Sequence, residues 1–174
     1  DKHANITTGP VIDESAWTRL KGLVDDAVAR GATLLAGGER PTGMNAGHFL
    51  TPTVLAGVTE TMAVYREETF GPIVSIVPFD DKTDLLRMAN DCEEGGLTAY
   101  VFTRDLARAE HFSAHLRYGE IQINGVKYDI DLPHGGIGQS GVGHDCSALA
   151  LHDYLVQKRI TRALDTTTFG GLNP

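Results

Sequence analysis

From residue 73 onward the chain alternates β-branched runs with amphipathic segments, and this alternation limits the possible folds more than any other feature. The runs at 73–79, 97–103 and 120–124 have the composition of buried strands, and the segments between them carry apolar residues at helical spacing. Strand, helix, strand, helix, strand with short connections predicts right-handed crossovers and a parallel sheet. The fold class is therefore α/β, and ligands are expected beyond the carboxyl ends of the strands.

The first third of the chain is less regular but contains one clear amphipathic helix. Asp13 is a cap-type residue, Gly31 ends the pattern, and the apolar residues between them recur at helical spacing: Trp17, Leu20, Val24, Ala27 and Val28. Extended segments are expected at 33–36 and 49–55. Pro52 suits a sheet edge better than a sheet centre, because proline has no N–H to donate.

Cap residues also place the later helices. The helix after the strand at 73–79 is expected to begin at Asp80 or Asp81, and the next one at Asp105, because a short acidic side chain can accept the free N–H groups of a first turn. A further helix at 148–156 and a terminal strand at 159–164 close the chain.

Residues 67–72, Glu-Glu-Thr-Phe-Gly-Pro, connect the less regular first part of the chain to the alternation that begins at residue 73. A short helical turn is predicted at 62–68 and overlaps the start of this motif. The final Gly-Pro pair restricts the backbone, so the two carboxylates and Phe70 are held on an ordered turn that feeds the next strand. A carboxylate and an aromatic ring at this point suit a sugar hydroxyl and a flat heterocycle. The alternative interpretation is a charged loop with Phe70 in the core.

Composition excludes several classes of partner. The chain has 174 residues and a formal net charge of -8, which argues against nucleic acid and anionic membrane surfaces as partners. No apolar run is long enough to span a bilayer, and the first residues do not have the pattern of a secretory signal. Two cysteines provide no disulfide framework, so a reducing, cytoplasmic setting is expected.

The cysteines and histidines give little support to nucleophilic or metal chemistry. Cys146 adjoins His144 and Asp145, a set that can in principle activate a nucleophile, although residues this close in sequence seldom point at one another. Cys92 stands beside two glutamates, which disfavour a thiolate. Histidine spacing of the zinc-hydrolase kind is lacking, so no metal is predicted.

Asn124 and His134 are the remaining polar candidates. Both lie at or beyond the carboxyl end of a predicted strand, where a parallel sheet places its ligands. They flank or belong to a long irregular segment, 126–146, and connections of this length are usually functional. Each side chain either lines a pocket or caps loop backbone, and the residues leave both interpretations open.

Several consecutive motifs resemble those of the NAD(P)-dependent aldehyde dehydrogenases. Residues 67–72 resemble the family signature Glu-Glu-x-Phe-Gly-Pro, and 89–105 contain the Ala-Asn-Asp and Gly-Leu-Thr-Ala segments of its next block. Residues 119–124 resemble the strand that follows, and 133–141 resemble Pro-Phe-Gly-Gly-x-Lys-x-Ser-Gly. The resemblance runs in order from about residue 7 to about residue 162, and motifs in register are more specific than any one motif.

The resemblance implies a function for single residues. The family oxidises an aldehyde to a carboxylic acid through a cysteine thiohemiacetal and passes hydride to the nicotinamide of NAD or NADP. Glu68 matches the glutamate that holds the nicotinamide ribose hydroxyls, and Phe70 matches the aromatic ring beside the nicotinamide. Asn124 and the loop after it match the wall of the aldehyde pocket. His134 replaces the usual Phe and Gly138 the usual Lys, which implies a more polar pocket.

The resemblance also implies a domain organisation. Residues 1–156 correspond to part of the catalytic domain, and 157–174 to an oligomerisation strand and tail through which subunits form homodimers or homotetramers. The dinucleotide-binding domain, the general-base glutamate and the nucleophilic cysteine precede Asp1 in the family, so no catalytic residue is expected in this chain and the piece alone should be inactive. The alternative is a stand-alone, non-catalytic binding or interaction domain. The aldehyde and the choice of NAD or NADP stay open.

Overall fold

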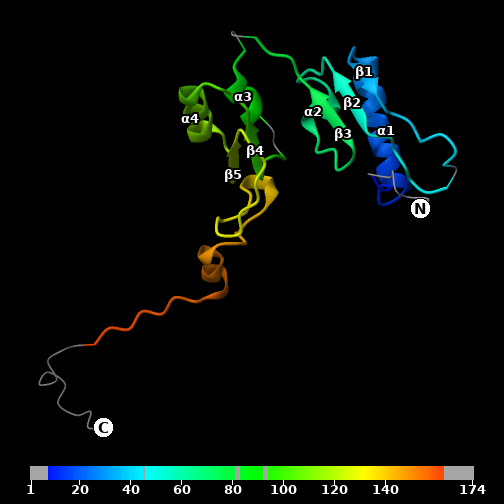
Figure 1. Ribbon diagram of the computed structural model, residues 1–174. Coiled ribbons are helices and arrows are strands. Elements are labelled where there is room, and N and C mark those ends of the chain that lie inside the picture. Colours follow the sequence, from blue (N-terminus) through cyan, green and yellow to red (C-terminus); the bar gives the residue numbers. More distant parts are fainter. Residues whose placement is uncertain (1–7, 45, 81–82, 92–93, 163–174) are drawn as a thin grey trace, which may run out of the picture.

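The computed structural model describes residues 8–44, 46–80, 83–91 and 94–162. These residues form two structural units joined near residue 80, with a C-terminal segment that runs away from both (Figure 1). The elements in chain order are α1 (Glu14–Ala29), β1 (Thr33–Ala36), β2 (Thr53–Ala56), α2 (Ala63–Arg66), β3 (Ile73–Ile76), α3 (Leu85–Asn90), β4 (Thr98–Val101), α4 (Leu106–His115), β5 (Glu120–Ile123), η1 (Gly138–Ser140) and η2 (Ala148–Tyr154).

Helix α1 forms where its sequence predicts it. Asp13 is its N-cap, and the Asp13 carboxylate accepts a hydrogen bond from the Ala16 N–H at 2.7 Å. Buried positions recur at helical spacing and make one apolar face: Leu20, Leu23, Val24 and Ala27. The predictions of β1 at 33–36 and of a helical turn before residue 67 are confirmed as well.

The first unit contains a sheet of three strands in the order β1-β2-β3. Strand β2 is central, antiparallel to β1 and parallel to β3, with Thr53 opposite Ile73 and Ala56 opposite Ile76. Pro52 immediately precedes β2, so its missing N–H interrupts no ladder bond. The Thr53 side chain is buried but satisfied, because its hydroxyl donates to the Thr51 carbonyl at 2.8 Å and accepts from the Gly38 N–H at 2.9 Å.

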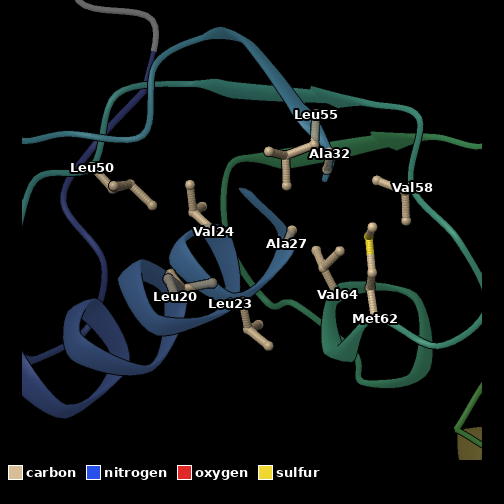
Figure 2. Close-up of a cluster of buried hydrophobic side chains, with 10 residues drawn as sticks. All are labelled: Leu20, Leu23, Val24, Ala27, Ala32, Leu50, Leu55, Val58, Met62 and Val64. Carbon is tan, nitrogen blue, oxygen red and sulfur yellow. The ribbon is translucent and has the colours of Figure 1, made fainter. Parts of the chain in front are cut away.

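The hydrophobic core of the described residues lies between α1 and this sheet, and α2 closes one end of it (Figure 2). Ten buried side chains form the cluster: Leu20, Leu23, Val24, Ala27, Ala32, Leu50, Leu55, Val58, Met62 and Val64. They come from every element of the first unit except β1 and β3, together with the connecting loops. Packing one helix stripe on one sheet face is the usual way for such elements to bury their apolar surface.

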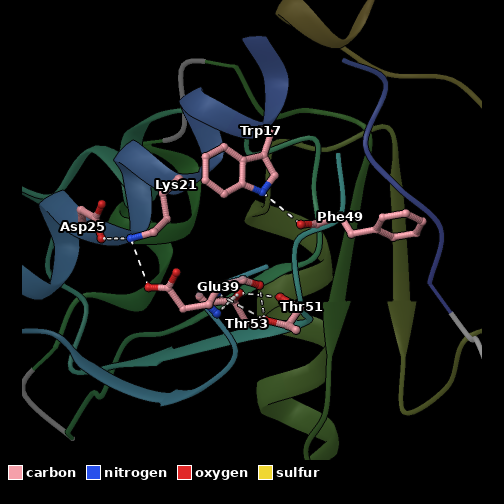
Figure 3. Close-up of polar contacts among 8 residues, drawn as sticks. Trp17, Lys21, Asp25, Glu39, Phe49, Thr51 and Thr53 are labelled. Carbon is pink, nitrogen blue, oxygen red and sulfur yellow. Dashed lines mark hydrogen bonds and ion pairs between the residues drawn. The ribbon is translucent and has the colours of Figure 1, made fainter. Parts of the chain in front are cut away.

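Polar contacts brace the long loop between β1 and β2 against α1 (Figure 3). The Trp17 indole N–H donates to the Phe49 carbonyl at 3.0 Å. One turn further along α1, the Lys21 ammonium lies 2.5 Å from an Asp25 oxygen and 3.4 Å from a Glu39 oxygen. These contacts hold the exposed side of α1 in place, so the opposite side stays packed on the sheet.

The second unit contains the parallel pair β4 and β5, with Thr98 opposite Glu120 and Val101 opposite Ile123. Helix α4 begins after Asp105, as predicted, and the Asp105 carboxylate accepts from the Arg108 N–H at 3.1 Å.

The predicted cap of the helix before β4 is wrong. Asp84, not Asp80, caps α3 by accepting from the Arg87 N–H at 3.0 Å. The Asp80 carboxylate instead accepts from the Thr83 hydroxyl at 2.9 Å in a separate turn. Asp81, the other predicted cap, lies outside the described residues.

Parallel pairing confirms the α/β fold class, but the described strands form two sheets and not the single sheet that the alternation predicts. Strand β3 pairs with β2 and ends at Ile76, two residues before Pro78. Proline has no N–H for a ladder, which explains why β3 is shorter than the predicted strand 73–79. Strand β2, at residues 53–56, thus supplies the parallel neighbour of β3, a pairing that local sequence does not encode.

Residues 126–162 contain little regular structure. The predicted helix at 148–156 is the 3₁₀ helix η2, and the described part of the predicted strand 159–164, residues 159–162, is not a strand. A strand exists only when another backbone pairs with it, and no described strand borders this segment. Residues 163 and 164 lie outside the described residues. Among the described helices, none combines the length and apolar character needed to cross a bilayer.

Candidate functional site

The loop at 67–72 lies between α2 and β3, against the core of the first unit. Its Pro72 carbonyl accepts from the Thr53 N–H at 2.8 Å, which ties the loop to the start of β2. A Cβ placed on Gly71 would lie 2.5 Å from Leu20 Cδ1, a fully buried core atom. Glycine suits this position because the backbone passes directly over the buried Leu20 side chain, which a larger residue would have to displace.

Phe70 points to solvent from a strained backbone. Its φ is 42°, in the left-handed region, and its side chain is 79% exposed. A non-glycine residue in this region costs on the order of 1–3 kcal/mol and persists only where the surroundings enforce it. The alternative interpretation of Phe70 as a core residue is wrong, and the ring is accessible to a ligand.

Glu68 lies two positions before Phe70 on the same loop and presents a carboxylate that is unpartnered within the described residues. Among the described residues its side chain makes no hydrogen bond or ion pair, whereas its backbone is held on both sides. The Glu68 N–H donates to Glu94 Oε2 at 2.7 Å, and its carbonyl accepts from Arg19 Nη1 at 3.2 Å. The Arg19 Nη2 donates to the Thr69 carbonyl at 2.6 Å. The backbone is thus fixed while the carboxylate is left available.

The Glu68 and Phe70 side chains offer two different kinds of ligand contact. A carboxylate is an acceptor for sugar hydroxyls, and an exposed aromatic ring offers a flat apolar face to a heterocycle. Both side chains project from one short loop that the core and three side-chain-to-backbone bonds hold in place. Placement by a rigid element favours recognition, because less freedom is lost on binding.

Asn124 and His134 lie on the second unit, apart from this loop. The Asn124 side-chain oxygen accepts from the Thr103 N–H and its amide donates to the Thr103 carbonyl, each at 2.8 Å. Asn124 has a φ of 53°, a conformation that asparagine tolerates. The sequence left two interpretations open for Asn124, a pocket residue or a cap of loop backbone. The structure shows that Asn124 caps the backbone, and this cap extends the pairing of β4 and β5 by one residue. Its place in an aldehyde pocket stays a prediction.

His134 lines a groove of about 440 Å³ between β5 and the irregular segment after it. Its Nδ1 lies 3.3 Å from Glu120 Oε2, and its ring meets the Tyr128 ring edge-on at a centroid distance of 5.9 Å. The backbone of His134 forms a two-bond bridge with Asp145, which fixes the side chain at the groove wall. The lining is mixed: Glu120, Gln122, Lys127 and Asp129 add polar groups to it, and Ile121, Ile123, Leu132 and Pro133 add apolar ones.

Glu120 is a site residue that the sequence analysis missed. Its carboxylate accepts from Thr98 Oγ1 at 3.3 Å and from Gln122 Nε2 at 2.6 Å, in addition to facing His134. The available signal was the alternation along β5, which places Glu120 and Gln122 on the same face of the strand.

The Cys-His-Asp interpretation of residues 144–146 is wrong. The Cys146 sulfur lies 2.8 Å from the Tyr128 hydroxyl, and within the described residues it makes no hydrogen bond with His144. Contact with Cys146 raises the pKa of the Tyr128 hydroxyl. Cys92 lies outside the described residues, and among those residues no three His, Cys, Asp or Glu side chains are grouped as metal ligands.

Comparison with known proteins identifies a family. A model of the aldehyde dehydrogenase family matches residues 1–160. The non-phosphorylating aspartate-semialdehyde dehydrogenase of Halomonas elongata is 40% identical over 157 residues, which are 89% of this chain and 31% of that protein. The chain thus spans about a third of the length of the curated relatives that it resembles.

Solved structures show the same relationship. The Mycobacterium tuberculosis aldehyde dehydrogenase complexed with NAD+ superimposes with a TM-score of 0.76 at 36% identity, covering 84% of this chain and 30% of that one. An E. coli NADP dependent enzyme superimposes with a TM-score of 0.78 at 38% identity, covering 86% and 31%. Identity at this level, with this similarity of fold, indicates common descent and not only a shared architecture.

Proposed function

The chain belongs to the aldehyde dehydrogenase family, and we propose that it supplies nicotinamide-ribose contacts, a wall of the aldehyde pocket and subunit contacts to a longer NAD(P)-dependent enzyme. That enzyme would oxidise an aldehyde to a carboxylic acid. The observation that carries the proposal is the loop that presents a free Glu68 carboxylate and an exposed Phe70 ring two positions apart. The family relationship supports it, and of the similar structures one is complexed with NAD+ and another is an NADP dependent enzyme.

In the proposed complex, Glu68 accepts hydrogen bonds from the ribose hydroxyls and Phe70 packs beside the nicotinamide ring. The dinucleotide, when bound, supplies the electron acceptor for aldehyde oxidation. Fixing the ribose orients the ring that is attached to it, and correct orientation of reacting groups accounts for a large part of enzymatic rate enhancement. The strained backbone of Phe70 supports this function, because such strain gathers at ligand-binding positions.

His134 and its neighbours form the proposed aldehyde-pocket wall. The imidazole and the Glu120 carboxylate face each other across 3.3 Å, so this part of the wall offers hydrogen-bonding groups in place of the aromatic ring that the family usually has. A polar aldehyde is the substrate class that fits such a wall, because the imidazole and the carboxylate can exchange hydrogen bonds with polar groups of a substrate. Asn124 supports the wall indirectly by joining the ends of β4 and β5.

Residues 157–162 are the proposed subunit contact. Their side chains are exposed, and Ile160 is exposed to 81%. An extended, unpaired backbone beside apolar side chains suits pairing with the sheet edge of a second subunit, in a homodimer or homotetramer. A cytoplasmic location, inferred from composition, is part of the same proposal.

Substitution of Glu68 by Gln in the intact enzyme tests the proposal. The amide keeps the size of the side chain but weakens its bonds to the ribose, so kcat should fall by about 10- to 100-fold through misplacement of the nicotinamide. Glu110→Gln, on the exposed face of α4, is the matched control and should leave kcat unchanged. Unchanged kinetics for Glu68→Gln with both cofactor and aldehyde would remove the cofactor role. Dinucleotide binding without turnover of any aldehyde would favour the non-catalytic alternative.

A further inference from the structure

Arg19 lies on the exposed side of α1, almost 50 positions before the loop that carries Glu68, yet its side chain reaches that loop. Its two terminal nitrogens donate to consecutive backbone carbonyls, those of Glu68 at 3.2 Å and Thr69 at 2.6 Å. A planar guanidinium can bridge two such acceptors at once, which a lysine ammonium does less well. The contact therefore fixes two successive peptide groups to α1.

Glu94 holds the same loop from the other side. Its Oε2 accepts from the Glu68 N–H at 2.7 Å, a charge-assisted bond of the strong kind. Glu94 follows α3 in the second unit, and the two units are also joined nearby by Arg87 Nη1 to Glu60 Oε1 at 2.8 Å. Both backbone polar groups of Glu68 are therefore held by charged side chains from different parts of the fold.

The choice of acceptor is informative. Arg19 is a cation beside an anionic side chain, but the structure directs its guanidinium to the Glu68 carbonyl and not to the Glu68 carboxylate. An ion pair between them would occupy the oxygens that a ligand needs. The observed arrangement restrains the backbone and leaves the carboxylate free.

The strain at Phe70 explains why the restraint is needed. A phenylalanine at a φ of 42° relaxes unless neighbouring contacts over-determine the loop. One side of that restraint is the close packing of Gly71 on Leu20, and the other is the set of bonds from Arg19 and Glu94. We propose that Arg19 and Glu94 are positioning residues that clamp the loop at 67–72 and thereby orient Glu68 and Phe70 toward the nicotinamide nucleoside.

The clamp itself is tested by amide hydrogen exchange of the intact enzyme without ligand. Removing the bonds with Arg19→Ala or Glu94→Ala should accelerate exchange at residues 67–71 by about tenfold or more, the size expected for loss of a bond to a charged group. Glu94→Gln keeps an acceptor oxygen and should restore most of the protection. The control is Arg30→Ala, which removes an arginine that pairs with Asp26 at 2.7 Å at the other end of α1. Exchange at 67–71 equal to that of Arg30→Ala would overturn the clamp.

The link from the clamp to the cofactor rests on the proposed function and has its own test. Arg19→Ala should lower kcat less than Glu68→Gln does, and the loss of kcat in the double variant should be smaller than the product of the two single effects, because Arg19 acts in part through Glu68. General destabilisation would instead multiply the two effects, and that outcome would overturn the positioning role. If Glu68→Gln alone changes nothing, the proposed function fails, while the exchange measurement still decides whether the clamp exists.

Discussion

The two units of this chain contain the same kinds of element but differ in how much apolar surface they bury. In the first unit, α1, α2 and the three-stranded sheet enclose ten buried apolar side chains. In the second unit, α3, α4 and the β4-β5 pair bury one apolar residue among those described, Ala109. Local sequence signals therefore form helices and parallel strands equally well in both units, but only the first encloses a core.

The exposed apolar residues of the second unit are those that a core would ordinarily cover. Phe102 at the end of β4 is 69% exposed and Leu106 in α4 is 76% exposed. Burying such a side chain contributes about 1.5–3 kcal/mol, so leaving many of them in water is unfavourable. The difference between the units agrees with the proposed function, in which the second unit packs against other parts of a longer enzyme.

Matched leucine truncations should show the largest contrast. Leu55 of β2 is fully buried, and Leu55→Ala should lower the free energy of unfolding by about 2–5 kcal/mol through lost contacts and a cavity. Leu106→Ala removes an exposed side chain and should cost less than about 0.5 kcal/mol in the 174-residue polypeptide. Urea unfolding of both variants measures the difference. Equal costs would mean that the second unit has a core of its own.

Alanine at two glycines tests how tightly each unit is packed. At Gly71 the added Cβ would meet Leu20 at 2.5 Å, so Gly71→Ala should destabilise by about 1–3 kcal/mol and displace the loop at 67–72. At Gly125 the nearest atom, the Ile123 carbonyl oxygen, is 3.9 Å away, so Gly125→Ala should fold as well as the parent. Thermal unfolding checks both, and a silent Gly71→Ala would contradict the close packing of loop on helix.

Removal of equivalent helix caps should give a smaller contrast. Asp13→Ala removes the N-cap of α1 and should cost about 1 kcal/mol of global stability, because α1 carries much of the core. Asp105→Ala removes the N-cap of α4 and should mainly increase local opening of that helix. Amide hydrogen exchange measures the local opening of α4 and chemical unfolding measures the global stability, so the two measurements together separate the effects. A global loss from Asp105→Ala as large as that from Asp13→Ala would show that α4 is part of one cooperative core.

Acidification should weaken the first unit slightly. The Arg30 side chain, and then the Ala63 N–H, hold the pKa of the Asp26 carboxyl below its ordinary value of 3.8. The stabilising contribution is therefore present above that ordinary value and is lost as the pH falls through the lower folded value. Asp26→Asn should narrow the stability difference between neutral and acidic pH, as followed by urea midpoints. An identical pH dependence in parent and variant would exclude this contribution.

The sequence predicts local features well and long-range pairing poorly. The caps at Asp13 and Asp105 were found because a cap residue and its target lie within one turn of chain. The cap of α3 was misplaced because Asp80, Asp81 and Asp84 all have suitable side chains, and only the turn with Thr83 selects among them. The pairing of β2 with β3 joins two segments that are distant in the sequence, and no local pattern records it.

The same limit applies to the site. Glu68 and Phe70 could be proposed as site residues because they lie together in one short motif, and the exposure of Phe70 then excluded a core position. Arg19 and Glu94 were missed because 49 and 26 positions separate them from Glu68. Contacts to backbone atoms are especially hard to foresee, because any residue type at the receiving position would satisfy them.

The most direct test of the difference between the units is amide hydrogen exchange of the 174-residue polypeptide, compared with a longer native protein that contains it. The account predicts strong protection of α1, β2 and β3 in both forms, and of β4 and β5 only in the longer protein. Protection of β4 and β5 in the 174-residue polypeptide equal to that of β2 would contradict it, because the second unit would then be stable without added contacts.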